Sequence, residues 1–221
     1  MNTSIKRLSP ILALTLGVGL LTLGQPAGAE YLKTFEGWKI YNSSCILCHG
    51  PQGRGDGALA KKRGLKAADF RARRQRLDGL SDNELLNEIK GNSGHFKGMP
   101  KWRDIYADPQ LNAVVAYIRY LSRSSHPLEA NPAEGQGLYR MYCTSCHGET
   151  GKGDGFMTTL TDIVPANHTD AARMDKYSNK QLVEIIKNGR ALMPAWGGMI
   201  DDHHILEMVS YIRLLSHPSG R

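Results

Sequence analysis

Cysteine is scarce in this chain of 221 residues. The chain has only four cysteines, and all four belong to one pattern that occurs twice. No alternation of strands and helices is recognisable, which disfavours a thioredoxin-like redox domain. No apolar run beyond residue 23 is long enough for a membrane-spanning helix, which needs ~20 residues. The formal net charge is +7, yet basic and aromatic residues do not interleave in a nucleic-acid-binding motif, so we expect no nucleic-acid partner.

The repeated cysteine pattern is Cys-x-x-Cys-His, the attachment signature of c-type haem. In such sites two thiols add to the vinyl groups of one porphyrin, and the histidine lies beneath the ring. A single zinc site is disfavoured, because zinc ribbons separate their cysteine pairs by roughly 15–20 residues and these pairs lie much further apart. The sequence therefore predicts two covalently bound haem c groups, held at Cys45, Cys48, Cys143 and Cys146, with His49 and His147 as iron ligands.

Glycine-rich loops follow both motifs, but they lack the Gly-Lys-Ser/Thr ending of a phosphate-binding loop and open no clear helix. We expect them to form tight turns instead. The first loop is Gly53-Arg54-Gly55-Asp56-Gly57 and the second is Gly151-Lys152-Gly153-Asp154-Gly155.

These loops belong to an internal repeat of roughly 95 residues. Matched positions lie at constant distances from the two cysteine motifs. They include Gly37 and Gly135, Tyr41 and Tyr139, Met99-Pro100-Lys101-Trp102 and Met193-Pro194-Ala195-Trp196, and Tyr117-Ile118-Arg119 and Tyr211-Ile212-Arg213. The sequence predicts two tandem domains, residues 30–126 (copy one) and 127–221 (copy two).

Each copy is expected to be all-α. Apolar residues at helical spacing predict a middle helix after Ser81 and after Ser178, each serine being suited to cap it. First helices are expected over residues 31–42 and 132–142. Last helices are expected with Asp108 as the cap and Pro109 in the first turn, and with Asp201 or Asp202 as the cap.

Residues 1–29 are typical of an export signal. Lys6 and Arg7 precede an apolar run over residues 11–23, and small residues follow at 27–29. We expect cleavage near Ala29 and a mature protein in the periplasm, where the thiols are consumed by haem attachment rather than by disulfides.

Met99 and Met193 are the candidate sixth ligands of the two irons. Each is followed by proline, which fixes the local chain, and thioether ligation is a known complement to histidine. His95, which has no counterpart in copy two, is a rival ligand for the first iron. The remaining histidines are expected at the surface or at helix caps: His126, His168, His203, His204 and His217.

With these motifs, each half resembles a class I cytochrome c domain, and the whole resembles the tandem di-haem cytochromes c of bacterial respiration. The resemblance implies one-electron transfer between redox proteins and no catalytic residues. It also implies that the first and last helices cross through Gly37 and Tyr41 with Tyr117, and through Gly135 and Tyr139 with Tyr211. The glycine-rich loop and Ala68-Asp69-Phe70 look like those of cytochrome domains attached to respiratory oxidoreductases. The resemblance therefore allows two forms, a soluble carrier or a subunit of a membrane-bound respiratory complex.

Copy one carries an excess of positive charge between its haem motif and its middle helix. The basic residues are Lys61, Lys62, Arg63, Lys66, Arg71, Arg73, Arg74 and Arg76. One interpretation is a docking face for an acidic redox partner at the first haem. The other is a solvated loop without a partner.

A different functional class is a di-haem enzyme, such as a peroxidase or a sulfur-compound oxidase, with one open or exchangeable iron position. The matched Met-Pro pairs argue against it, because they fill both positions. The unpaired His95 and the longer loop around it in copy one are the features that favour it.

Overall fold

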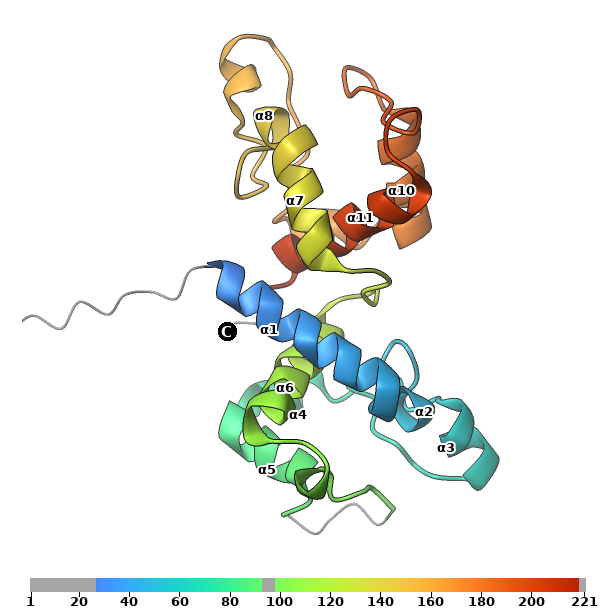
Figure 1. The fold of residues 1–221 in the computed structure, drawn as a ribbon. Helices are drawn as coiled ribbons and strands as arrows, with labels where there is room; N and C mark the ends of the chain where they lie inside the picture. Colours follow the sequence, from blue (N-terminus) through green and yellow to red (C-terminus); the bar gives the residue numbers. More distant parts are fainter. Residues whose placement is uncertain (1–26, 93–97, 219–221) are drawn as a thin grey trace, which may run out of the picture.

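The structure is a computed structural model that describes residues 27–92 and 98–218. Within these ranges it is all-α, and its extended pairing is limited to one isolated bridge between Arg190 and Met193. The helices form two groups that follow one another along the chain (Figure 1). None of the helices in the described part combines the length and the apolarity needed to cross a bilayer. The expected fold class is confirmed.

Copy one begins with α1 (Ala27–Ile40), which continues through a π-helical turn (Tyr41–Cys45) into α2 (Ile46–His49). It goes on with α3 (Ala58–Arg63), α4 (Arg74–Gly79), α5 (Asp82–Lys90), a 3₁₀ turn (Trp102–Asp104) and α6 (Asp108–Arg123). Copy two contains α7 (Pro132–Tyr142), α8 (Thr144–His147), a 3₁₀ turn (Phe156–Thr159), α9 (Ala171–Met174), α10 (Asn179–Asn188) and α11 (Asp202–Ser216).

Helix α3 was not expected from the sequence, which predicted that the first glycine loop forms a tight turn and opens no helix. Its N-cap is Gly57 in an extended conformation, and Ala58 to Ala60 are good helix formers with Ala60 buried. Gly64 ends the helix in the left-handed conformation. The basic residues Lys61 to Arg63 therefore lie on a helix rather than in a loop.

The caps of the middle helices are as predicted. Ser81 accepts from the backbone N–H of Glu84, whose side chain accepts from the Ser81 N–H in return. Ser178 and Gln181 make the same reciprocal pair in copy two. These capping boxes satisfy two helix-terminal N–H groups each.

The caps of the last helices differ in one case from the prediction. Asp201 caps α11 by accepting from the N–H of His204 at 2.9 Å. In copy one the N-cap residue of α6 is Ala107 rather than Asp108. The Gln110 side chain accepts from the Ala107 N–H at 3.0 Å, and the Asp108 carboxylate pairs with Lys90 instead.

The first and last helices of each copy cross at a glycine. A Cβ atom on Gly37 of α1 would lie 1.9 Å from the carbonyl oxygen of Ala113 in α6. A Cβ on Gly135 of α7 would lie 1.9 Å from the carbonyl oxygen of Glu207 in α11. Only a residue without a side chain allows the backbones to approach this closely. Beside each crossing, Tyr41 packs edge-on against Tyr117 and Tyr139 against Tyr211.

The two copies share a packed joint. Tyr31 of α1 lies edge-on to Tyr211 of α11, with ring centroids 5.6 Å apart. The segment between α6 and α7 is pinned to both sides, because Leu128 accepts from the Trp38 indole and Ala130 donates to Ser210. Figure 1 shows α1 running past the end of copy two before it reaches α2.

Candidate haem sites

The two cysteine motifs occupy equivalent places at the ends of the first helices. Cys45 ends the π-helical turn and Cys48 lies in α2, whereas Cys143 separates α7 from α8 and Cys146 lies in α8. All four thiols are free of disulfides. The described residues bring together no cluster of three or more His, Cys, Asp or Glu side chains that could hold a metal ion.

Burial also affects the chemistry of the first thiol of each pair. It raises the pKa of Cys45 and of Cys143 to about 12, and the neighbouring thiol of Cys48 or Cys146 adds to the rise. Both groups are therefore neutral thiols at neutral pH.

The two histidines are fixed by equivalent hydrogen bonds. Nδ1 of His49 lies 3.2 Å from the carbonyl oxygen of Ala68, and Nδ1 of His147 lies 3.0 Å from that of Ala166. Because a carbonyl only accepts, each Nδ1 carries the hydrogen, and Nε2 keeps its lone pair for a metal. Burial lowers the pKa of both imidazoles, although the carbonyl bond opposes this, so both are neutral ligands.

An aromatic ring stacks on each of these histidines. The Phe70 ring lies 4.8 Å from the His49 ring at 18°, and the His168 ring lies 4.3 Å from the His147 ring at 16°. Both residues are held by the glycine loop, because Phe70 donates its N–H to Gly53 and His168 to Gly151. Sequence reasoning missed both rings. Aligning Ala68-Asp69-Phe70 with Ala166-Asn167-His168 at equal distance from the two motifs would have found them.

His168 contradicts the prediction that it lies at the surface. Its side chain is 8% exposed, and its Nδ1 lies 3.0 Å from the hydroxyl of Tyr139. Burial, and the charges of His147 and Arg173, lower the pKa of His168 to about 3. His217 is also buried, bonded to Asp175 at 2.9 Å, but it is the C-cap of α11, which agrees with the predicted cap role. The surface prediction is confirmed for His203 and His204.

Met193 is held in a tight turn of copy two. Its N–H donates to Arg190 at 2.9 Å, and its carbonyl accepts from Arg190 at 3.2 Å. Gly189 and Ala191 both have positive φ within this turn. The Met193 side chain is partly buried against the core of copy two, beside Trp196.

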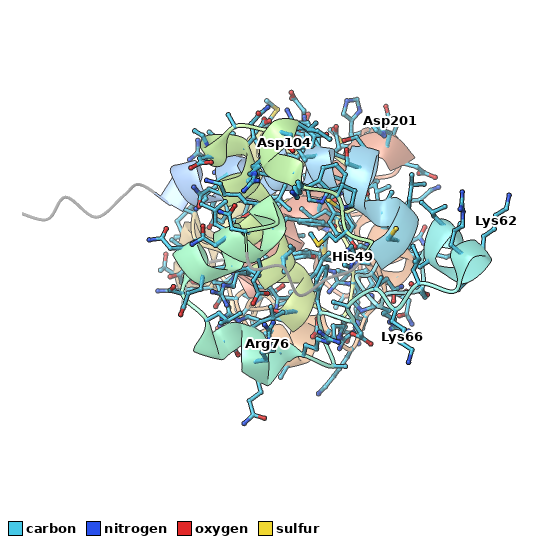
Figure 2. The ribbon with its side chains drawn as sticks, turned by 90° about the horizontal axis from the view of Figure 1, so that it is seen from below. His49, Lys62, Lys66, Arg76, Asp104 and Asp201 are labelled. Atoms are coloured by element: carbon cyan, nitrogen blue, oxygen red, sulfur yellow. The ribbon has the colours of Figure 1, made fainter. Side chains whose placement is uncertain are left out.

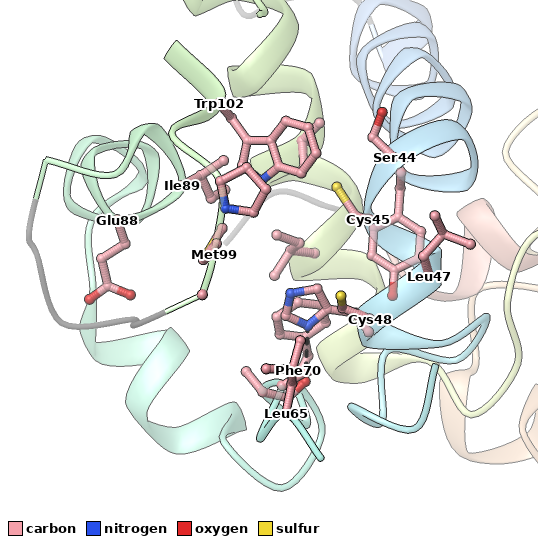
Figure 3. A pocket seen from close by; sticks show the side chains of 18 of the residues that line it. Ser44, Cys45, Leu47, Cys48, Leu65, Phe70, Glu88, Ile89, Met99 and Trp102 are labelled. Carbon is pink, nitrogen blue, oxygen red and sulfur yellow. Dashed lines mark hydrogen bonds between the residues drawn. The ribbon is translucent and has the colours of Figure 1, made fainter. Parts of the chain in front are cut away.

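Met99 takes the matching place in copy one. It packs partly buried against the core and lines a cavity together with Cys45, Cys48 and His49. Figure 3 shows Met99 and Ile89 on one wall of this cavity and Cys45 and Cys48 on the other. His95, the rival ligand, lies outside the described residues, so its interpretation stays a hypothesis.

The cavity of copy one measures about 340 Å³, within the range of roughly 300–1,000 Å³ for small-molecule sites. Its walls are mainly apolar, and three basic residues, Lys66, Arg73 and Arg76, also line it. A porphyrin has two wide apolar faces and two propionates, so the walls and the basic groups suit it. The donor set adds two thiols, one imidazole and one thioether. These residues therefore fit haem c.

Two helical domains, each with a Cys-x-x-Cys-His turn and a fixed imidazole, define a tandem di-haem cytochrome c of the class I type. A family model described as cytochrome c oxidase, cbb3-type, subunit III matches residues 33–118 and 130–212. The chain belongs to this family, and its cofactors are two covalently bound haem c groups.

Relatives with curated names agree with this assignment. The cbb3-type cytochrome c oxidase subunit FixP of Bradyrhizobium diazoefficiens is 28% identical over 81% of this chain and 60% of its own length. The subunit CcoP of Azospirillum brasilense is 30% identical over 81% of this chain and 61% of its own length. The cytochrome bc1 complex cytochrome c subunit of Mycobacterium tuberculosis is 25% identical over 78% of this chain and 69% of its own length. The chain thus spans about 60% of the length of the oxidase subunits that it matches.

Proposed function

We propose that this protein passes single electrons between respiratory redox partners, with His49 and Met99 binding the first haem iron and His147 and Met193 the second. Cys45, Cys48, Cys143 and Cys146 tether the two groups. When bound, haem c supplies an iron that alternates between the ferric and ferrous states. The relatives named as subunits of respiratory complexes support this role, either as a free carrier or within an oxidase complex.

One observation carries the proposal. In both copies the histidine Nδ1 is bound to a carbonyl oxygen 19 residues further along, which leaves Nε2 as the ligand atom. Met99 lines the same cavity as His49, and Met193 packs against the core of copy two, so the proposed ligand set would fill the sixth position of each iron. This arrangement supports a carrier without catalytic residues over the enzyme alternative.

The test combines a haem count with electron paramagnetic resonance and near-infrared spectra of the oxidised protein. We expect two haems, both low-spin, with the near-infrared band of methionine bound to ferric iron. Met99→Ala and Met193→Ala should each remove about half of that band, and His95→Ala serves as the control that leaves it intact. One high-spin or bis-histidine haem in the unmodified protein would overturn the proposed ligand set.

We also propose that residues 1–29 direct export, so that the haem domains, residues 30–126 and 127–221, lie in the periplasm. The pattern of charge, apolar run and small residues supports this location. A mass measurement of the purified protein should place its first residue near Glu30. A mature protein that still begins at Met1 would contradict cleavage.

The finer proposal for partners is that an acidic redox protein docks at copy one. Lys62, Arg63 and Lys66 are exposed, and no ion pair is formed by them among the described residues. Figure 2 shows Lys62 and Lys66 extending outward at the edge of the molecule. At equal distances from His147, copy two carries Leu160 and Val164 in place of these two lysines.

Exchanging these side chains tests the docking proposal. The paired change Lys62→Leu and Lys66→Val should slow reduction of the first haem by an acidic redox protein at low salt roughly tenfold, because steering charges raise association rates by 10–10³. The matched control, Leu160→Lys with Val164→Lys, should give the second haem a salt dependence that it lacks. Equal salt effects on both haems in the unmodified protein would contradict the proposal.

A further inference from the structure

The His168 side chain is buried beside the proposed iron ligand His147, although His168 is not itself a proposed ligand. It lies in the interior of copy two, stacked on His147 and hydrogen-bonded to the fully buried Tyr139. The Tyr139 ring in turn packs edge-on against Tyr211 at the helix crossing. A continuous chain of contacts therefore joins the crossing of α7 and α11 to the proximal imidazole.

The backbone leaves His168 little freedom to leave this place. Its N–H donates to the Gly151 carbonyl at 2.6 Å. A Cβ on Gly151 would lie 2.8 Å from Leu215 and 3.3 Å from the Cβ of His168, so the glycine allows the loop to close over the ring. The imidazole is thus clamped between the glycine loop and His147.

Copy one provides the natural comparison. Phe70 occupies the same place, with the same backbone bond to Gly53 at 2.8 Å and nearly the same stacking angle. There the Tyr41 hydroxyl donates instead to the Gly50 carbonyl at 2.6 Å. The two sites therefore share the backbone and the stacking, and they differ in the chemistry of one ring.

We propose that His168 is a positioning residue that orients His147 and lowers the midpoint potential of the second haem relative to a site with phenylalanine at that place. The inference rests on the proposed ligation of iron by His147. A polar ring beside the proximal ligand favours the oxidised, more positive iron, whereas an apolar ring does not, and such neighbours are known to tune metal centres. The hydrogen bond between the Tyr139 hydroxyl and Nδ1 of His168 fixes the plane of His168 and, through stacking, the plane of His147.

Reciprocal exchange of the two rings is the experiment. His168→Phe should shift one of the two waves in a potentiometric titration to higher potential, and Phe70→His should shift the other wave to lower potential. Each variant should leave the unaffected haem where it was. The low-spin electron paramagnetic resonance signal of the shifted haem should move too, since it reports the orientation of the axial imidazole.

Two further variants separate positioning from folding. Tyr139→Phe removes only the hydrogen bond, so we expect the signal of the second haem to broaden or move while its methionine band stays. Combining Tyr139→Phe with His168→Phe avoids a buried hydroxyl without a partner, and it should keep the raised potential of His168→Phe.

The haem count and the near-infrared methionine band of the same samples test ligation separately. If both haems and both bands are intact but His168→Phe and Phe70→His move neither wave, or move both waves equally, the inference is wrong although the proposed function stands. If a haem or a band is missing in the unmodified protein, the proposed function fails instead.

Discussion

The two copies surround different side chains with the same backbone. Both bind the proximal histidine through a carbonyl 19 residues away, and both close the glycine loop with one N–H to carbonyl bond. On this shared frame copy one, residues 30–126, carries 17 Lys and Arg against 10 Asp and Glu, whereas copy two, residues 127–221, carries 9 against 11. The duplication has kept the geometry that holds a haem and varied the charges and rings around it.

A buried arginine shows the same principle. Arg119 in α6 and Arg213 in α11 each donate to two backbone carbonyls near the start of the middle helix. The third partner is the carboxylate of Asp82 in copy one and the amide of Asn179 in copy two. Burial lowers the pKa of Arg213, partly offset by the charges of Tyr120, Asp175 and Glu129. Both arginines thus bind two backbone carbonyls, and the sites differ only in the side-chain partner, which is charged in Asp82 and neutral in Asn179.

The largest effect is expected at the two helix crossings, where the copies should behave alike. Gly37→Ala and Gly135→Ala each place a methyl group 1.9 Å from a backbone oxygen that no side-chain rotation can move. Each should lower the free energy of unfolding by about 3 kcal/mol or more, as severe overpacking does. Denaturant unfolding followed by far-ultraviolet circular dichroism measures it, with Gly137→Ala, which meets nothing within 4 Å, as the control. If only one of the two variants lost stability, the two helix crossings would not be equivalent.

A smaller and unequal effect is expected at the arginines. Asn179→Asp gives Arg213 a carboxylate but removes the N–H that binds the Pro127 carbonyl at 3.0 Å, leaving two oxygens facing each other. We expect a loss of about 2 kcal/mol, the usual cost of a buried group without its partner. Asp82→Asn removes the charge of a half-exposed carboxylate, while the buried Arg119 keeps its two carbonyl partners, and should cost about 1 kcal/mol or less. Stability gained in the first variant would show that charge, rather than the amide donor, governs this site.

The smallest effect concerns the joint between the copies. Burial acts to raise the pKa of Asp175, but the hydrogen bond and charge of His217, with the bond from Ser125, lower it below its usual value. A carboxyl with a lowered pKa stabilises the fold above its unfolded pKa of ~3.9 and loses that contribution as pH falls through the folded pKa.

Asp175→Asn should therefore cost about 1 kcal/mol at pH 7 and make little difference near pH 2. Unfolding curves at the two pH values measure the change. Asp170→Asn, which alters an exposed cap outside the joint, gives the reference. A cost that is the same at both pH values would mean that packing, and not charge, holds Asp175.

The periodic and motif-bearing parts of the fold were predictable from the sequence. The capping boxes at Ser81 and Ser178 and the bounds of α7 followed from local rules that tertiary packing did not override. Helix α3 was missed because glycine and basic residues look like a loop, and burial of Ala60 decides otherwise. A single sequence cannot reveal such burial.

The candidate site divides in the same way. The spacing of the cysteine motifs was enough to predict two covalent haems, whereas the iron ligands His49, Met99, His147 and Met193 stay a prediction. His168 was misplaced at the surface because a lone histidine carries no sign of its surroundings, and its partner Tyr139 lies 29 residues away. The ring contacts that tune a cofactor depend on how the loop folds back, which only the structure reveals.

The packed joint has a consequence for the speed of electron exchange between the haems. Tyr120 lies edge-on to His217, Ser125 binds Asp175, and Tyr31 reaches Tyr211, so side chains from both copies interlock across it. Two domains joined by a loose tether must diffuse into contact before each transfer, and solvent viscosity then limits the rate. Here the separation is set by packing, and internal electron transfer should run at the same rate in glycerol as in water.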